Sequence, residues 1–277
     1  MREFAAIFLA LIFETTPFLL AGVLISVGAG RPLERALASA AFKNPLAGTL
    51  AGVSAGIALP MCDCGSRPLA HRLALAGRRE FAIAFLVAAP VVNPIVVVTT
   101  WLAFRDPELL MLRLGITALM AVATALVVAR FSGEIALASV VTAKSDEEGS
   151  FASRALGEFF ELFQYLVVGA ALAAVIQVFV DRSVLTSTGG AFLSISALMA
   201  LAFLLSICSS VDAFVVAGFG GLGLGPVLAF LTFGPVMNLK SLPMYLRLFS
   251  LPVVLVIAVV AGEFAFLIGV AAEFRAW

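Results

Sequence analysis

The stretch 81-FAIAFLVAAPVVNPIVVVTTWLAF-104 runs through the first half of the chain without a single charged residue. A bilayer core about 30 Å thick is crossed by about 20 apolar residues in a helix, so this stretch is long enough to span a membrane. It also carries Pro90, Asn93 and Pro94 near its middle. Proline removes a backbone donor and breaks a helix. The stretch therefore predicts a transmembrane helix that is interrupted near its centre.

Seven further apolar stretches accompany this one. The chain is 62% hydrophobic and 12% charged, whereas a soluble domain has roughly 45 to 50% apolar and about 25% charged residues. The predicted spans are 4–29, 44–61, 81–104, 109–131, 158–181, 190–208, 222–246 and 249–273. We therefore expect an all-α fold, a polytopic transmembrane helical bundle of about 8 spans, or about 10 if each half has a re-entrant crossing.

An internal repeat relates the two halves of the chain. The matching positions include a glutamate, a cysteine and a Pro-x-x-Asn segment, all rare in apolar sequence. They are Phe13-Glu14 and Gly22 with Phe160-Glu161 and Gly169, Cys62 with Cys208, and Ala84–Asn93 with Ala229–Asn238. The spacing between the copies drifts by only two residues, which favours duplication over coincidence.

A polar segment divides the predicted halves. Residues 132–157 include the charged run Lys144-Ser145-Asp146-Glu147-Glu148, which is typical of a solvated linker. We expect a first transmembrane repeat at 1–131, the linker at 132–157 and a second repeat at 158–277, with broken helices in both. Four spans per half predict a parallel repeat, and one extra crossing per half predicts an inverted one.

The segment Leu59-Pro60-Met61-Cys62-Asp63-Cys64-Gly65 ends one apolar helix and begins a short one. Broken backbone at membrane depth is tolerated only inside protein or along a cavity, so the segment marks a candidate binding site. Thiolates prefer soft, thiophilic metals and metalloids. Cys62, Cys64 and Cys208 are therefore candidate ligands of a soft metalloid. The alternative is that these cysteines are ordinary small apolar residues.

Pro90 and Asn93 in the first half correspond to Pro235 and Asn238 in the second. Proline frees backbone carbonyl groups in a spanning helix, and asparagine can bond them or face a ligand. Because the break recurs, we expect these four residues at a substrate-binding region between the halves. Two structural kinks would give the same pattern.

Ionisable residues also interrupt the apolar stretches. A charge at mid-bilayer is costly, so such residues pair or face a cavity. Asp212 and Lys240 form the expected ion pair, and Asp63, between two thiols, is the expected proton carrier. We expect Glu14 and Glu161 either to bond across helices as a pseudo-symmetric structural pair or to face a cavity.

The Cys62-Asp63-Cys64-Gly65 motif, followed by Pro68-Leu69-Ala70 and by Ala89-Pro90-Val91-Val92-Asn93-Pro94, resembles the ArsP-type family of predicted permeases. The resemblance extends over nearly the whole chain. It implies a multi-pass permease of the inner (plasma) membrane, and the characterised branch implies efflux of trivalent organoarsenicals such as methylarsenite. Asp63 stands where the family commonly has serine, which leaves the substrate and the coupling ion open.

The leading hypothesis is a secondary transporter that exports trivalent arsenicals or a similar thiophilic solute. A permease for a metal ion, a sulfur compound or another small molecule is the alternative, and a membrane thiol redox protein is a further one. We expect a transporter and not an enzyme, with no cofactor. The zero net charge gives no indication of a nucleic-acid partner. The bilayer and the solute are the expected partners, and a homo-oligomer stays open.

Overall fold

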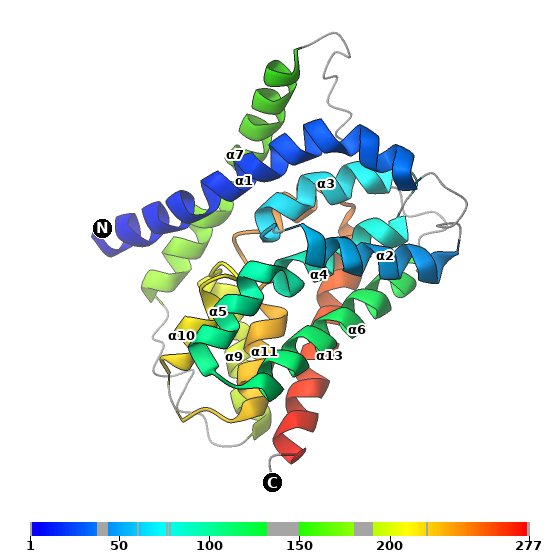
Figure 1. Cartoon of the computed structure of the whole chain (residues 1–277). Coiled ribbons are helices and arrows are strands. Elements are labelled where there is room, and N and C mark those ends of the chain that lie inside the picture. Colours follow the sequence, from blue (N-terminus) through cyan, green and yellow to red (C-terminus); the bar gives the residue numbers. More distant parts are fainter. Residues whose placement is uncertain are drawn as a thin grey trace.

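The computed structural model describes residues 2–37, 44–59, 61–75, 77, 79–131, 150–179, 191–219 and 221–275. Throughout these ranges the regular elements are helices (Figure 1). They are α1 (Arg2–Leu37), α2 (Pro45–Ala58), α3 (Asp63–Leu75), α4 (Arg79–Val92), α5 (Pro94–Phe104), α6 (Pro107–Phe131), α7 (Phe151–Phe179), α9 (Ala191–Leu205), α10 (Asp212–Ala217), α11 (Leu224–Phe233), α12 (Leu242–Leu248) and α13 (Leu251–Arg275). Pro60 and residues 132–149 of the predicted linker lie outside the described residues.

In the described residues each of the eight predicted apolar stretches contains helix, interrupted at the breaks, which confirms the polytopic helical bundle. Within the described ranges, five are long enough to cross a membrane: Arg2–Gly28, Arg79–Phe104, Pro107–Arg130, Phe151–Val175 and Leu251–Phe274. The other three, α2, α9 and α11, have 14, 15 and 10 residues. At 1.5 Å per residue they reach about 15 to 22 Å, less than the bilayer core. Each of these short helices leads directly into a break.

Two sets of three helices form the core. In the first half α2 packs against α4 and α6, and in the second half α9 packs against α11 and α13. Helix α4 lies at the centre of its set, with every residue from Phe81 to Val92 buried. This explains why its sequence is apolar on all sides, since it faces neither lipid nor water.

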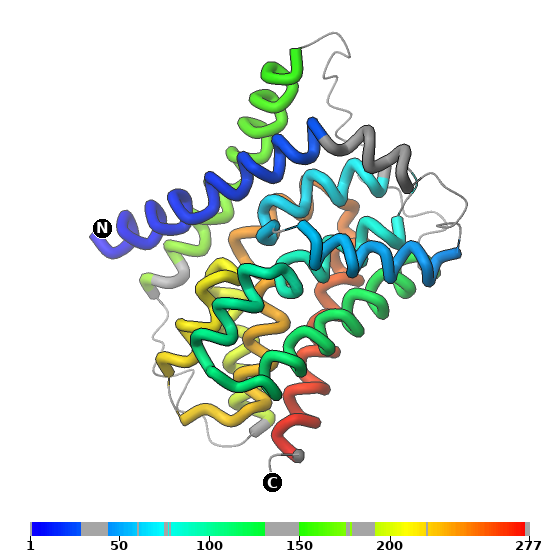
Figure 2. The backbone as a smooth tube through the Cα atoms, viewed as in Figure 1, coloured from blue at the N-terminus to red at the C-terminus, as the bar shows by residue number. Residues whose placement is uncertain are grey.

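Helices α6 and α13 join the two sets and run in opposite directions. Leu109 near the start of α6 shares an apolar cluster with Ala272 near the end of α13. Val128 near the end of α6 shares another with Val253 near the start of α13. Figure 2 shows the same antiparallel course along the two tubes.

Glycines set how closely the first helix of each half approaches the breaks. A Cβ atom at Gly22 of α1 would collide with the backbone of Gly65 in α3, and one at Gly169 of α7 would collide with the backbone of Lys240. A residue without a side chain permits this approach. The two glycines therefore hold α1 and α7 against the segments that carry the candidate site.

Candidate functional site

Four helix breaks converge on one region of the structure. They are Met61-Cys62 ahead of α3, Asn93 between α4 and α5, residues 206–211 between α9 and α10, and residues 234–241 between α11 and α12. Asn93 Nδ2 donates to the Met61 carbonyl over 3.3 Å. The Lys240 backbone N–H donates to Ser206 Oγ over 3.1 Å. These bonds tie the breaks together in pairs.

Ser206 turns the chain at the end of α9. Its φ of 51° is left-handed, a conformation that residues other than glycine adopt rarely. Its side chain donates to the Phe203 carbonyl of α9 and accepts the Lys240 N–H, so its own helix and the break before α12 hold it in place. Backbone strain of this kind tends to gather at functional segments.

The two asparagines make the same pair of hydrogen bonds. Asn93 Nδ2 donates to the Ala89 carbonyl over 2.9 Å, and its Oδ1 accepts from the Val96 N–H over 3.1 Å. Asn238 Nδ2 donates to the Gly234 carbonyl over 3.1 Å, and its Oδ1 accepts from the Ser241 N–H over 3.0 Å. Each amide therefore satisfies backbone groups that the break would leave unpaired.

The prolines differ more than the asparagines. Pro90 lies inside α4, which continues to Val92, so the break in the first half comes at Asn93. In the second half α11 ends at Phe233, two residues before Pro235. Both prolines are buried at the expected breaks.

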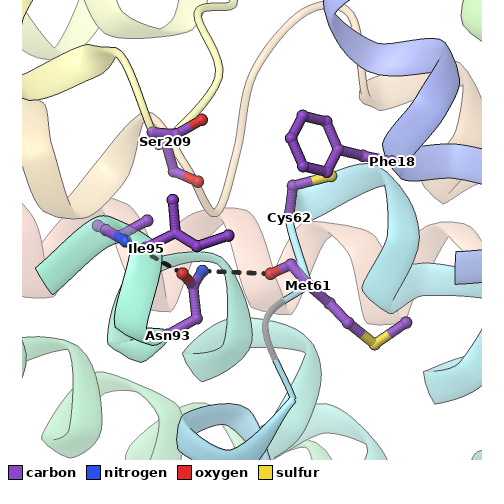
Figure 3. A pocket seen from close by; sticks show the side chains of 8 residues that line it. Phe18, Met61, Cys62, Asn93, Ile95 and Ser209 are labelled. Atoms are coloured by element: carbon purple, nitrogen blue, oxygen red, sulfur yellow. Dashed lines mark hydrogen bonds between the residues drawn. The ribbon is translucent and has the colours of Figure 1, made fainter. Parts of the chain in front are cut away.

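A small pocket opens where three of the breaks meet (Figure 3). Its lining brings together a thiol, hydroxyl groups, an amide and apolar side chains. The residues are Phe18, Met61, Cys62, Asn93, Ile95, Val96, Ser209 and Ser210. In Figure 3 Cys62 and Phe18 lie on one side of the space, with Asn93 and Ser209 opposite. No carboxylate belongs to this lining.

The three cysteines are free and buried, but they do not act as one set. The thiols of Cys62 and Cys64 lie within hydrogen-bonding reach of each other. Cys208 Sγ instead lies 3.2 Å from Ser210 Oγ.

Among the described residues no three His, Cys, Asp or Glu side chains gather as a metal-ion site. The three-thiol site predicted from sequence is therefore not assembled in this conformation. Cys62 and Cys64 form a thiol pair, and Cys208 belongs to a separate contact.

Behind the pair lies a buried charge cluster. Arg67 Nη2 lies 3.5 Å from Asp63 Oδ2, which also accepts from Asn238 Nδ2 over 3.2 Å. The Arg67 guanidinium stacks 4.5 Å from the centre of the Tyr245 ring. Arg67, Asp63, Asn238 and Tyr245 are all buried. The cluster joins α3 of the first half to the break before α12 in the second.

Lys240 is the other buried cation of this cluster. Its Nζ has no hydrogen-bond partner in the described part of the chain, and the groups that act on it electrostatically are Asp63, Cys64, Cys208 and Glu14. The ion pair predicted between Asp212 and Lys240 is therefore wrong. Asp212 Oδ2 instead accepts from Arg113 Nη2 over 2.6 Å. Sequence distance misled the prediction, because the fold brings the side chain of Arg113 on α6 to Asp212 at the start of α10.

Glu14 and Glu161, matched in sequence, have different partners. Glu161 pairs with Arg247 of α12, and Glu158, one turn earlier on α7, pairs with Arg72 of α3. Glu14 Oε1 is buried and has no hydrogen-bond partner in the described part of the chain. The two glutamates therefore do not form a symmetric structural pair.

Sequence reasoning did not select Arg67 or Arg113, which are fully buried. Arg113 carried a signal, as a lone cation within the apolar stretch 109–131. Arg67 was hidden in a segment that reads as an interfacial run of arginines. Only the fold shows that it points inward.

Comparisons with known proteins identify the family of the chain. The chain is similar to the UPF0718 protein YcgR of Bacillus subtilis, with 33% identity over 265 residues and 88% of each chain covered. It is also similar to a Streptococcus mutans protein named as a subunit of a two-component membrane permease complex, with 31% identity over 260 residues, 88% of this chain and 86% of the relative. No solved structure matches the chain. The family described as predicted permease, ArsP type, matches residues 1–274. The chain is therefore a multi-pass membrane permease that belongs to the ArsP family.

Proposed function

We propose that this permease exports a small thiophilic solute, a trivalent organoarsenical such as methylarsenite, through the pocket beside Cys62. One observation carries the proposal: a single small pocket presents a thiol, hydroxyl groups and apolar side chains together. Methylarsenite offers the matching groups, a thiophilic arsenic atom, two hydroxyls and a methyl group. Phe18, Ile95 and Val96 supply the apolar wall, and Ser209 and Ser210 supply the hydroxyls.

Cys62 and Cys64 are the ligands that we assign to arsenic. Two As–S bonds form and two As–O bonds break, and the two thiol protons leave with the hydroxyl groups as two water molecules. Arsenic stays trivalent, and the bound complex carries no added charge. A neutral complex suits a buried site, since an added charge would be costly at this depth.

The same pocket argues against a hard divalent cation such as Mg²⁺ or Ca²⁺ as the solute. Hard cations need oxygen ligands that are largely carboxylates, and the lining contains none. A sulfur compound or another small neutral molecule with thiol affinity would fit the lining, and competition with methylarsenite tests these alternatives.

The pathway runs between two halves, 1–131 and 158–277, linked by 132–157. The matched hydrogen bonds of Asn93 and Asn238 support this division. The opposite course of α6 and α13, which are matched in sequence order, favours an inverted repeat. In an inverted pair, movement of one half against the other opens a central site to each side in turn.

The partners of the permease are the bilayer, the solute and a second subunit. The similarity to a protein named as a subunit of a two-component membrane permease complex supports the second subunit. A homo-oligomer is the alternative assembly. Size measurement of the complex extracted from its native membrane separates these outcomes.

Binding to purified protein tests the function. Methylarsenite should protect Cys62 and Cys64 of the wild type from maleimide, as read by mass spectrometry. Cys62→Ser and Cys64→Ser should each lose methylarsenite binding, whereas Ser54→Ala on the exposed face of α2 should keep it. Cys208→Ser separates a two-thiol from a three-thiol site, because only a third ligand would weaken binding when removed. Full binding by a variant lacking both Cys62 and Cys64 would contradict the proposal.

A further inference from the structure

A second buried polar cluster lies apart from the thiol pair. Arg113 of α6 donates from Nη2 to Asp212 Oδ2 and from Nη1 to Thr100 Oγ1, each over 2.6 Å. All three residues are buried. Asp212 Oδ1 and Arg113 Nε have no hydrogen-bond partner in the part of the chain that is described. The carboxylate thus has one oxygen bound to the cation and one with room for a proton.

This cluster connects to both walls of the pocket. Thr100 Oγ1 donates to the Val96 carbonyl over 2.7 Å, and the Val96 N–H donates to Asn93 Oδ1. Val96 and Asn93 both line the pocket. On the other side Asp212 begins α10 and directly follows the loop that carries Ser209 and Ser210. The Arg113–Asp212 pair therefore holds α5, α6 and α10 together around the solute.

Asp212 is better placed to take a proton than Asp63. Asp63 faces two buried cations, Lys240 and Arg67, and also accepts from Asn238. Asp212 faces a single cation, Arg113. An ionised carboxylate that faces two cations resists protonation more strongly than one that faces a single cation.

Among the described residues, the helices that pack against α10 carry no other buried charge. Helices α5 and α11, which pack against α10, carry no ionisable side chain. On α6, Glu108 and Arg130 are exposed at the two ends, and Arg105 with Asp106 forms the turn before it. Arg113 is the charged partner that Asp212 contacts among the described residues.

We propose that the Asp212–Arg113–Thr100 cluster is the proton-binding site that couples solute export to a proton gradient. A proton from the aqueous phase joins Asp212 and neutralises it, which leaves Arg113 as a buried cation without its counter-ion. Such a charge is strongly destabilising, so the protonated state favours a different packing of α5, α6 and α10. Release of the proton on the other side restores the pair. The inference rests on the proposed function, because it couples that same pocket.

Proteoliposomes containing the purified permease, a trapped pH dye and a methylarsenite gradient test the coupling. Wild type should change the internal pH as methylarsenite moves. Asp212→Asn combined with Arg113→Gln removes both charges, so no lone buried charge remains to prevent folding. This double variant should still exchange labelled for unlabelled methylarsenite, but the pH change should be lost. Glu108→Gln, an exposed carboxylate on the same helix, should keep both.

The outcomes separate the two proposals. If the double variant still moves protons with methylarsenite, or if the wild type moves methylarsenite down its gradient without any pH change, the coupling site is overturned and the permease function stands. If the wild type does not exchange methylarsenite at all, the proposed function fails and the coupling inference fails with it. A structural role alone would change the exchange rate and leave the ratio of protons to solute intact.

Discussion

Asn238 Nδ2 donates a hydrogen bond to Asp63 Oδ2 over 3.2 Å, across 175 residues of sequence. Both residues are buried. The bond joins the break ahead of α12 to the first residue of α3, so it links the two halves beside the thiol pair. Asn238 also bonds its own helix break on both sides. One amide therefore shapes the break and connects it to the opposite half.

Replacing this amide should destabilise the fold. Asn238→Ala leaves the Gly234 carbonyl without its donor, removes one donor to Asp63 Oδ2, and removes the side-chain acceptor of the Ser241 N–H. An unsatisfied buried polar group costs about 1 to 3 kcal/mol. Thermal unfolding in detergent should show a lower midpoint, with Ser54→Ala on the surface of α2 unchanged. An unchanged midpoint for Asn238→Ala would mean that water already satisfies these groups.

The sequence predicted the helices and their breaks because both depend on local composition. Long apolar stretches can only be helical in a bilayer, and proline with asparagine interrupts them. The break at Asn93 and the break after Phe233 were both found in this way. The same reasoning missed the short length of α2, α9 and α11, because hydropathy continues through the bends that end them.

Charge pairing could not be predicted from the sequence. Asp212 lies 28 residues from Lys240 and 99 residues from Arg113, yet it binds Arg113. Which charges meet depends on how α6, α10 and α12 pack, and an apolar stretch holds little information about its neighbours. The inward direction of Arg67 was hidden for the same reason. The sequence predicted that Asp63, Asp212 and Lys240 are buried, but not which charges would pair.

The contact between α1 and α3 predicts opposite effects for two glycines. Gly22→Ala would drive a Cβ atom into the backbone of Gly65, which cannot move aside as a flexible side chain would. Overpacking of this kind costs about 1 to 3 kcal/mol. At Gly115 in α6 a Cβ atom meets nothing within 4 Å, so Gly115→Ala should stabilise the helix by about 0.5 to 1 kcal/mol. Unfolding midpoints of the two variants should move in opposite directions, and a shared direction would contradict the close crossing.

The antiparallel course of α6 and α13 predicts which ends share a side of the membrane. In a chain without native cysteines, Glu108→Cys near the start of α6 and Phe274→Cys near the end of α13 should react from the same side with a membrane-impermeant maleimide. Arg130→Cys at the end of α6 should react from the other side. All three positions are exposed. Labelling of right-side-out and inverted vesicles measures this, and a parallel arrangement would place Glu108 and Phe274 on opposite sides.

Two ion pairs of different burial should differ in their contribution to stability. The side chains of Arg113 and Asp212 are 0% and 3% exposed, whereas those of Arg72 and Glu158 are 32% and 18% exposed. Removing one partner of a buried pair leaves an uncompensated charge and costs about 3 to 5 kcal/mol. An exposed pair contributes about 0.2 to 1 kcal/mol because solvent screens it. Arg113→Met should therefore lower the unfolding midpoint far more than Arg72→Met.

Adding Asp212→Asn to Arg113→Met should recover much of the loss, because it removes the carboxylate charge that Arg113→Met leaves buried without a partner. If the double variant unfolds as early as Arg113→Met, the cost lies in packing around α6, and the carboxylate of Asp212 is not the group that responds to the loss of its cation.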